Sequence, residues 1–251
     1  MKPIIMLDEV LLVSNMKRFV LRFVPLLILC SLIVSLPKIN MVKASGTIYI
    51  RAGGTVEGTD KIQRDGDVYT FTANIYDSIV VERDNIVVDG AGYTLQGTGA
   101  YRPKGIDLAG RSNVTIKNTR VSNTHYGIHL DESSNNNVIG NYITKNSNIA
   151  LYSSSNNNVT GNNITNNSGN GIYFVDSSNN TISGNNITNN NSGIYLEGSS
   201  NNTISRNNVA NNYNGIWVSG SSNNIFTIIT SLITITTFSI SRWIYGMRMP
   251  Q

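Results

Sequence analysis

Three side chains near the middle of the sequence have types suited to acid–base chemistry. Asp107 lies in the segment Gly-Ile-Asp-Leu, and His129 and Asp131 lie in the related segment Gly-Ile-His-Leu-Asp. Alternate residues of a strand point to the same side, so His129 and Asp131 would share a face. Two carboxylates and an imidazole could act as acid and base on a uronic-acid polymer, or bind a divalent ion. The alternative is a solvated cluster of polar residues at the edge of a sheet.

Aromatic residues take the place of Asp107 and His129 in later segments of the same kind. Tyr173, Tyr195 and Trp217 each follow a Gly-Ile pair. If equivalent residues lie on one another, these rings form a flat strip, stacked ring over ring, of the kind on which sugar faces pack. The strip predicts a ligand site for polysaccharides or cell-envelope glycans. The alternative is that the rings only seal the outer surface of a sheet.

The elements that would position these residues are short and regularly repeated. Successive isoleucines of the repeat are 22, 21, 23, 22 and 22 residues apart, and two further apolar positions keep the same period. The three series are Ile106, Ile128, Ile149, Ile172, Ile194 and Ile216; Val138, Val159, Ile182, Ile204 and Ile225; and Val121, Ile143, Ile164, Ile187 and Val209. Three apolar positions per period, separated by Asn, Ser and Gly, predict a coil of three strands that stacks on itself.

The predicted fold is therefore all-β, a right-handed parallel β-helix with three strands per coil of about 22 residues. Isoleucine and leucine ladders would fill the inside, and Asn would occupy the corners because it tolerates left-handed backbone. Asn pairs such as Asn162-Asn163 would stack as amide ladders. The alternatives are a leucine-rich repeat horseshoe, which needs a different leucine pattern, and a disordered Asn/Ser-rich segment, which has no reason to keep three apolar registers.

The repeats resemble a known family. The segment 84–97, followed by Gly-Ile-Asp-Leu at 105–108 and Asn-Val-Thr-Ile-Lys-Asn at 113–118, is similar to the opening coils of NosD-like surface proteins. The wider group is the carbohydrate-binding and sugar-hydrolase (CASH) class of β-helix repeats. The resemblance runs from about Ile48 to Ile225 and implies the fold and export. It implies no single activity, because this fold carries enzymes, adhesins and scaffolds alike.

The first 44 residues predict a cleaved signal peptide. Lys17, Arg18 and Arg22 precede an apolar run of 14 residues, which is shorter than the roughly 20 that span a membrane. The whole chain has a net charge of +4, but residues 45–251 hold 13 basic and 13 acidic residues. Only Lys145 and Arg206 are basic between residues 134 and 224, which argues against nucleic-acid binding. We expect a secreted, cell-surface or periplasmic protein with no membrane span after cleavage.

The rest of the chain divides into three predicted regions. Residues 45–104 would form an N-terminal cap and first irregular coils, and residues 105–226 the regular repeats. Residues 227–251 are predicted to form an aberrant tail, because the sequence contains no Asn after residue 224. Our preferred hypothesis for the tail is a frameshift near codon 226, since Thr and Ile codons read one base over can encode Asn; the alternatives are a capping strand and a short membrane anchor.

The copper binding implied by the family name is poorly supported by the residues. Soft copper sites favour Cys, Met or several His. Cys30 and all six Met lie outside the repeats, which leaves only His125 and His129. We therefore expect no cofactor and no metal site.

These residues are compatible with three functions. The first is an exported, non-catalytic glycan-binding or structural element. The second is a carbohydrate-active enzyme, lyase- or hydrolase-like, that uses Asp107, His129 and Asp131. The third is a NosD-like periplasmic factor for the assembly of a metalloenzyme. The motifs typical of pectin hydrolases and pectate lyases are missing from the sequence, which favours the first.

Overall fold

The computed structural model describes residues 46–97, 103–145 and 148–230, together with the strands at 235–238 and 244–246. All of them belong to one compact unit, Ser45–Gln251. The regular structure of the described residues consists of strands and contains no helix. The predicted signal peptide, residues 1–44, lies outside the described residues.

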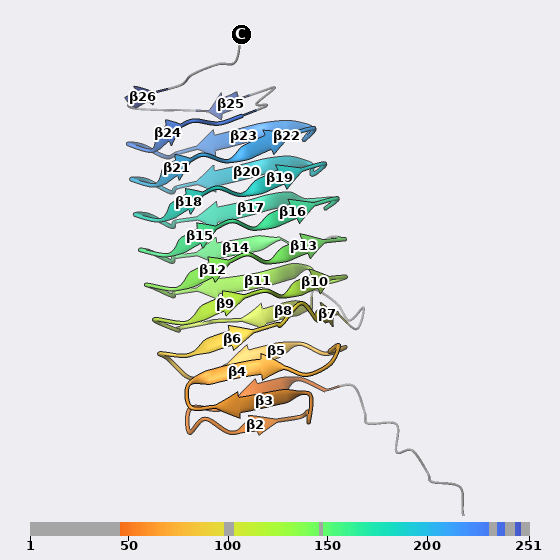
Figure 1. Cartoon of the computed structure of the whole chain (residues 1–251). Helices are drawn as coiled ribbons and strands as arrows, with labels where there is room; N and C mark the ends of the chain where they lie inside the picture. The colour runs from red at the N-terminus through yellow and green to blue at the C-terminus, as the bar shows by residue number, and fades with distance from the viewer. Residues whose placement is uncertain (1–45, 98–102, 146–147, 231–234, 239–243, 247–251) are drawn as a thin grey trace, which may run out of the picture. The chain divides into compact units, whose positions relative to one another are not determined.

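The strands form three sheets, and successive coils add one strand to each (Figure 1). The first sheet contains, in spatial order, β2 (Val56–Glu57), β1 (Ile48–Ile50), β5 (Ile79–Val81), β8 (Lys104–Asp107), β11 (Tyr126–Asp131), β14 (Ile149–Tyr152), β17 (Asn170–Val175), β20 (Ser192–Glu197), β23 (Asn214–Ser219) and β25 (Ile235–Phe238). The second contains β22 (Asn208–Ala210), β19 (Asn186–Thr188), β16 (Asn163–Thr165), β13 (Tyr142–Thr144), β10 (Arg120–Ser122) and β7 (Thr94–Gln96).

The third sheet completes the coil. It contains β26 (Ile244–Gly246), β24 (Ile225–Thr227), β21 (Thr203–Ser205), β18 (Thr181–Ser183), β15 (Asn158–Thr160), β12 (Asn137–Ile139), β9 (Thr115–Lys117), β6 (Val87–Asp89), β4 (Val68–Phe71) and β3 (Ile62–Asp65). Each strand of the repeats pairs in parallel with its equivalent in the next coil, for example Ile172 with Ile194 and Ile182 with Ile204. This confirms the predicted right-handed parallel β-helix.

The N-terminal end of the unit is less regular than the repeats. Here β1 pairs antiparallel with β2, and β3 pairs antiparallel with β4. Such hairpins cover strand edges that would otherwise be open to pairing with another chain. At the other end β25 and β26 continue the first and third sheets, by pairing with β23 and β24.

One hydrophobic cluster fills the inside of the coil from Ile48 to Ile229. The predicted inward isoleucines from Ile106 to Ile216 are fully buried, as are the residues two positions later, such as Leu130 and Phe174. The prediction for Ile225 is wrong: Phe226 is the buried register partner of Ile204, and Ile225 is 38% exposed. Glycine precedes most of the isoleucines from Ile106 to Ile216 because the backbone is crowded there. A Cβ on Gly193 would lie 2.5 Å from the carbonyl oxygen of Gly215 and 2.6 Å from Cγ1 of Val209, so a side chain does not fit there.

Asparagine holds the corners in two ways. Among the described residues, 19 other than glycine have positive φ, and 12 of these are Asn, the residue type that adopts left-handed backbone most readily after glycine. Other Asn side chains, all buried except the half-buried Asn212, form three ladders along the unit, which confirms the predicted amide ladders. The members are Asn136, Asn157, Asn180, Asn202 and Asn224; Asn141, Asn162, Asn185 and Asn207; and Asn167, Asn190 and Asn212.

Asn185 shows how one rung of a ladder works. Its backbone N–H and its Nδ2 both donate to Oδ1 of Asn207, each at 2.9 Å, and Nδ2 also donates to the carbonyl oxygen of Val159 at 2.9 Å. Its own Oδ1 accepts from the backbone and the amide of Asn162. One buried side chain thus satisfies polar groups of three coils, which is why Asn repeats at this place.

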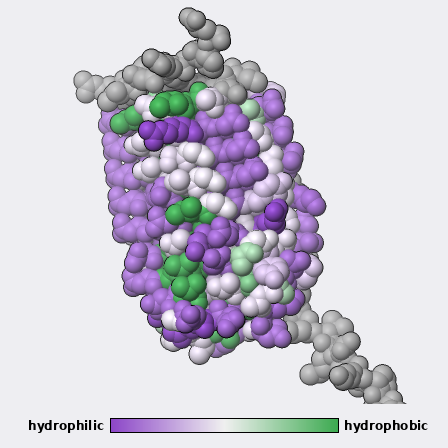
Figure 2. Space-filling view, viewed as in Figure 1, coloured by the Kyte–Doolittle hydropathy of each residue, from purple (hydrophilic) through white to green (hydrophobic). Residues whose placement is uncertain are grey.

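The outer surface is polar. Figure 2 shows one face of the unit, on which hydrophilic residues predominate and hydrophobic residues gather in small, separate groups. Within the part of the chain that the structure describes, no helix is long and apolar enough to cross a membrane.

Candidate functional site

The outer face of the first sheet carries a row of aromatic rings. Tyr173, Tyr195 and Trp217 are register partners on β17, β20 and β23, as the repeat predicts. The rings of Tyr195 and Trp217 are stacked, with centroids 5.9 Å apart and planes 13° apart. Tyr173 and Tyr195 instead meet edge to face, at 5.2 Å and 64°, so the predicted stacking of all three rings is only half correct. Both arrangements are favourable for aromatic pairs.

The row extends further than the sequence predicts. In the preceding coil the position equivalent to Tyr173 is Ala150, which is fully buried. Tyr152, two residues later on the same outer face, closes this gap: its ring centroid lies 5.7 Å from that of Tyr173 and 5.5 Å from that of His129. We call Tyr152, Tyr173, Tyr195 and Trp217 the aromatic strip.

Tyr152 is absent from the predicted strip because that prediction followed a single position of the repeat. The available signal was strand alternation, which places residues 150 and 152 on one face. A small residue at position 150 leaves space that a ring from the adjacent position can cover.

A cluster of polar residues adjoins the strip at its N-terminal end. Nδ1 of His129 lies 2.9 Å from Oδ1 of Asp107, its register partner on β8, and Oδ2 of Asp107 accepts a hydrogen bond from Lys104 Nζ at 2.9 Å. Burial acts to raise the pKa of Asp107, but the hydrogen bonds from His129 and Lys104 outweigh it and lower that pKa below its ordinary value. The structure therefore brings together two of the three predicted catalytic residues.

The imidazole of this cluster is enclosed. His129 is only 4% exposed. Its ring lies between those of Tyr126 and Tyr152, at 5.0 and 5.5 Å, and the two tyrosine hydroxyls are 2.8 Å apart. His125, the other histidine of the chain, also contacts Tyr126, with centroids 4.4 Å apart. The pair of tyrosines thus separates most of the imidazole of His129 from solvent.

Asp131 shares the outer face but stands apart from this pair. Its register partner on β14 is Tyr152, and its side chain makes no ion pair or hydrogen bond with another described residue. The structure therefore assembles Asp107 and His129 but adds Asp131 only as a neighbouring carboxylate.

The electrostatic environment of the strip is acidic. The hydroxyl of Tyr173 donates to Oε2 of Glu197 at 3.4 Å. Burial, followed by the nearby carboxylate of Glu197, raises the pKa of Tyr173 to about 12, and the same two causes raise the pKa of Tyr195. Both hydroxyls thus remain protonated at neutral pH and can donate hydrogen bonds.

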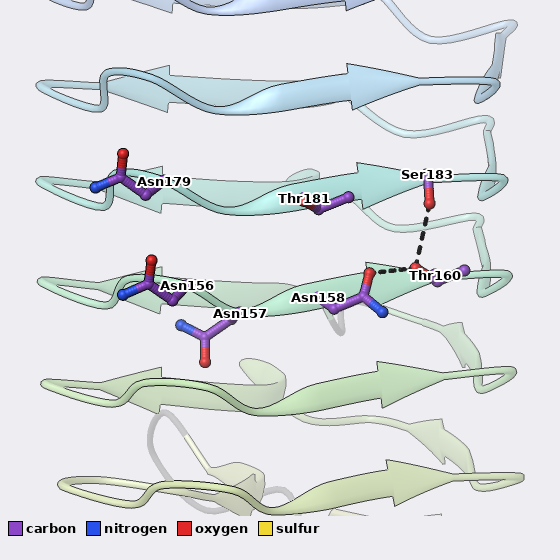
Figure 3. Close-up of a pocket in the computed structure, with 7 residues that line it drawn as sticks. All are labelled: Asn156, Asn157, Asn158, Thr160, Asn179, Thr181 and Ser183. Carbon is purple, nitrogen blue, oxygen red and sulfur yellow. Dashed lines mark hydrogen bonds between the residues drawn. The ribbon is translucent and has the colours of Figure 1, made fainter.

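The other two sheets carry shallow depressions without comparable groups. One, of about 580 Å³, lies on the third sheet and is lined by Asn156, Asn157, Asn158, Thr160, Asn179, Thr181 and Ser183 (Figure 3). Its Thr160 hydroxyl bonds with Asn158 and Ser183. The other, of about 600 Å³, lies on the second sheet beside Arg120 and Lys145. Neither depression combines aromatic rings with a carboxylate.

Metal-binding groups are sparse. Among the residues that the structure describes, no three His, Cys, Asp or Glu side chains are grouped so as to hold a metal ion.

Comparisons with known proteins agree with this architecture. Residues 60–228 match the family model described as periplasmic copper-binding protein (NosD). Among solved structures, the periplasmic alginate epimerase AlgG is similar, with a TM-score of 0.54, 20% identity, and coverage of 70% of this chain and 49% of the epimerase. The tailspike gp42 of Acinetobacter phage vb_AbaP_AS12 is similar with a TM-score of 0.51, 10% identity, and coverage of 74% of this chain and 40% of the tailspike.

These likenesses have a limited meaning. The chain spans about half the length of the epimerase, and at 20% identity or below the similarity shows the fold alone. The search of curated protein sequences finds no match.

Proposed function

The chain belongs to the NosD family of β-helix proteins, and from this premise we propose that it is an exported, non-catalytic protein that binds glycans through the aromatic strip. The strip is the observation that carries the proposal. It places four rings on successive coils of one sheet, in contact with one another and facing outward.

The geometry of the strip suits a sugar chain. Neighbouring coils are about 4.8 Å apart, roughly the length of one sugar unit in an extended chain. Apolar C–H faces of sugars pack on aromatic rings, and sugar hydroxyls bond to polar groups beside them. Tyr173, Tyr195 and Glu197 supply such groups. The periplasmic description of the family and the apolar run after Arg22 support export.

A second candidate is acid–base catalysis on a carbohydrate by Asp107, His129 and Asp131. The hydrogen bond between His129 and Asp107 favours it, because a carboxylate that orients an imidazole is a common catalytic arrangement. The enclosure of His129 by two tyrosines opposes it, because a base must reach the proton that it removes. We therefore rank it below glycan binding.

Copper, which the family description names, does not fit the residues present in the coils. Soft copper sites require thiolate, thioether or several imidazole ligands. The described residues include no Cys or Met, and of their two histidines His129 is enclosed, with Nδ1 bonded to Asp107. No step of the proposed function involves copper.

Affinity electrophoresis in gels containing soluble polysaccharides tests the proposal. The protein is compared with the double variant Tyr195→Ala/Trp217→Ala and with Tyr93→Ala, which removes a partly exposed tyrosine beside β7 in the second sheet. We expect at least one polysaccharide to retard the wild type and Tyr93→Ala equally, and the double variant much less. Equal retardation of all three, or no retardation by any polysaccharide, would refute the proposal. Circular dichroism checks that the variants are folded.

The enzymatic alternative has its own test. Incubation with uronic-acid polymers, followed by measurement of chain length and of unsaturated or epimerised products, should reveal no turnover. Turnover that His129→Ala abolishes would establish catalysis and overturn the non-catalytic assignment.

A further inference from the structure

The aromatic strip is flanked by two carboxylates from neighbouring coils. Glu197 ends β20 and is the register partner of Val175, and Asp176 directly follows Val175. Oδ1 of Asp176 lies beside Gly198, the residue after Glu197, so closely that a Cβ on this glycine would collide with it. Both carboxylates are exposed. Asp176 belongs to the same coil as Tyr173, and Glu197 to the same coil as Tyr195.

No positive charge balances these carboxylates within the described part of the chain. Neither Asp176 nor Glu197 takes part in an ion pair. The strands of the first sheet from β11 to β23, whose outer face carries the aromatic strip, contain no Lys or Arg. Lys104, on the adjoining β8, is already paired with Asp107. Burial is the main cause of the raised pKa values of Tyr173 and Tyr195, and the carboxylate of Glu197 adds to it.

This charge pattern discriminates between classes of glycan. A uronic-acid polymer would bring one carboxylate per sugar close to Glu197 and Asp176, and like charges at such distances repel one another. An amino sugar would bring an ammonium group instead. Ammonium groups are attracted both by carboxylates and by the faces of tyrosine and tryptophan rings.

We propose that the ligand of the aromatic strip is a linear polysaccharide of amino sugars with free ammonium groups, lying along the strip with its amines toward Glu197 and Asp176. The proposal rests on the proposed glycan-binding function and specifies the class of glycan. It departs from the substrate that the structurally similar alginate epimerase has by name, because the strip lacks the cations that a polyanion would need.

Isothermal titration calorimetry at pH 6 with three hexasaccharides of matched length tests this inference. The ligands are β-1,4-linked glucosamine, which is cationic, β-1,4-linked glucose, which is neutral, and β-1,4-linked mannuronate, which is anionic. We expect the glucosamine hexamer to bind about 5- to 20-fold more tightly than the glucose hexamer, and the mannuronate hexamer to bind most weakly. The preference should shrink as salt rises, because salt screens exposed charges.

Two variants, each lacking one carboxylate, test whether Glu197 causes the preference for glucosamine over glucose. Glu197→Gln should weaken binding of the glucosamine hexamer much more than that of the glucose hexamer, and bring the two affinities to within about twofold of each other, because it removes the charge that attracts the ammonium group. The matched control Asp65→Asn removes one exposed carboxylate on β3 of the third sheet and should leave the preference intact.

The outcomes separate the two proposals. Tightest binding of mannuronate, equal binding of glucosamine and glucose by the wild type, or a preference that survives Glu197→Gln would overturn the amino-sugar inference while glycan binding stands. Absence of binding by all three hexasaccharides would overturn both.

Discussion

Asp107 and His129 lie on neighbouring coils and face each other, with 2.9 Å between Oδ1 of Asp107 and Nδ1 of His129. They are register partners, so parallel pairing of β8 and β11 brings them together although 22 positions separate them in the sequence. The aromatic strip begins at this pair, because the ring of Tyr152 packs on His129. We therefore interpret the pair as an anchor for the end of the strip.

This interpretation predicts a pH-dependent contribution of Asp107 to stability. Asp107→Asn should lower the free energy of unfolding by about 1–2 kcal/mol, the typical worth of hydrogen bonds to a charged group that is partly buried. The folded state lowers the pKa of Asp107, so this contribution should be fully present above about pH 4 and vanish as pH falls through the lowered pKa.

Urea unfolding followed by circular dichroism between pH 2 and pH 7 measures this difference. Asp131→Asn is the control, because its carboxylate lies on the same face of the sheet without these partners, and it should change stability by less than about 0.5 kcal/mol. A deficit of Asp107→Asn that persists unchanged to pH 2 would show that the charge of Asp107 is not the cause.

The asparagine ladders predict a large contrast between two adjacent residues. Asn185→Ala should destabilise the protein by about 2–4 kcal/mol, because it leaves buried groups of Asn162 and Val159 without their partners. Asn186→Ala should cost less than about 1 kcal/mol, since Asn186 is exposed and its side chain bonds only to the side chains of Asn163 and Asn208, outside the buried ladders. Chemical denaturation of both variants measures the contrast, and equal losses would mean that the buried ladder does not stabilise the fold.

Ile228 predicts a stabilising substitution. It has a φ of +52° and is 51% exposed, and a β-branched residue in the left-handed region is strained. The equivalent corner has a positive φ in every earlier coil of the repeats, and its residues are Asn118, Gly140, Gly161, Gly184 and Arg206, none of them β-branched. Ile228→Asn should therefore raise the free energy of unfolding by about 0.5–1.5 kcal/mol.

The control for this substitution is Ile225→Asn, which replaces an exposed isoleucine within β24, outside the left-handed region. It should not stabilise the protein. If both substitutions have the same effect, surface hydrophobicity rather than backbone strain is the cause.

The nucleotide sequence separately tests the proposed frameshift: a shifted frame beyond codon 226 should encode another Asn-rich repeat.

The length of the aromatic strip predicts how affinity depends on the length of the glycan. Each sugar that packs on a further ring should strengthen binding roughly 2- to 10-fold, because an aromatic contact of this kind contributes about 0.5–1.5 kcal/mol. Affinity should rise from the disaccharide to about the tetrasaccharide, one unit per ring from Tyr152 to Trp217, and then level off.

Tyr173→Ala provides the matched variant for calorimetry of this series. It interrupts the strip but leaves the stacked pair of Tyr195 and Trp217, so it should weaken binding of the tetrasaccharide more than that of the disaccharide. Affinity that is independent of length would place the ligand elsewhere.

The repeat in the sequence was sufficient to predict the fold and the order of the ladders. Each buried isoleucine recurs in register, so the pairing of Ile172 with Ile194 follows from spacing alone. The same logic predicted that His129 lies above Asp107. These features depend on the backbone and its period, which short-range sequence patterns encode directly.

The details of the site could not be predicted in this way, because they depend on side-chain packing between coils. Tyr152 covers the space left by Ala150, and Tyr173 meets Tyr195 edge to face. Lys104 pairs with Asp107 three residues away, a separation that alternation would place on opposite faces of a strand. Rotamer choice decides each of these contacts, and a repeat pattern contains no information about it.

The most direct test of the proposed binding site is to observe Trp217 during glycan binding. In ¹H–¹⁵N spectra the indole N–H resonance of Trp217 can be assigned as the one that Trp217→Phe removes. We predict that titration with the glucosamine hexamer shifts this resonance progressively until saturation. Saturable shifts elsewhere in the spectrum while the Trp217 resonance stays fixed would contradict the assignment of the aromatic strip as the binding site.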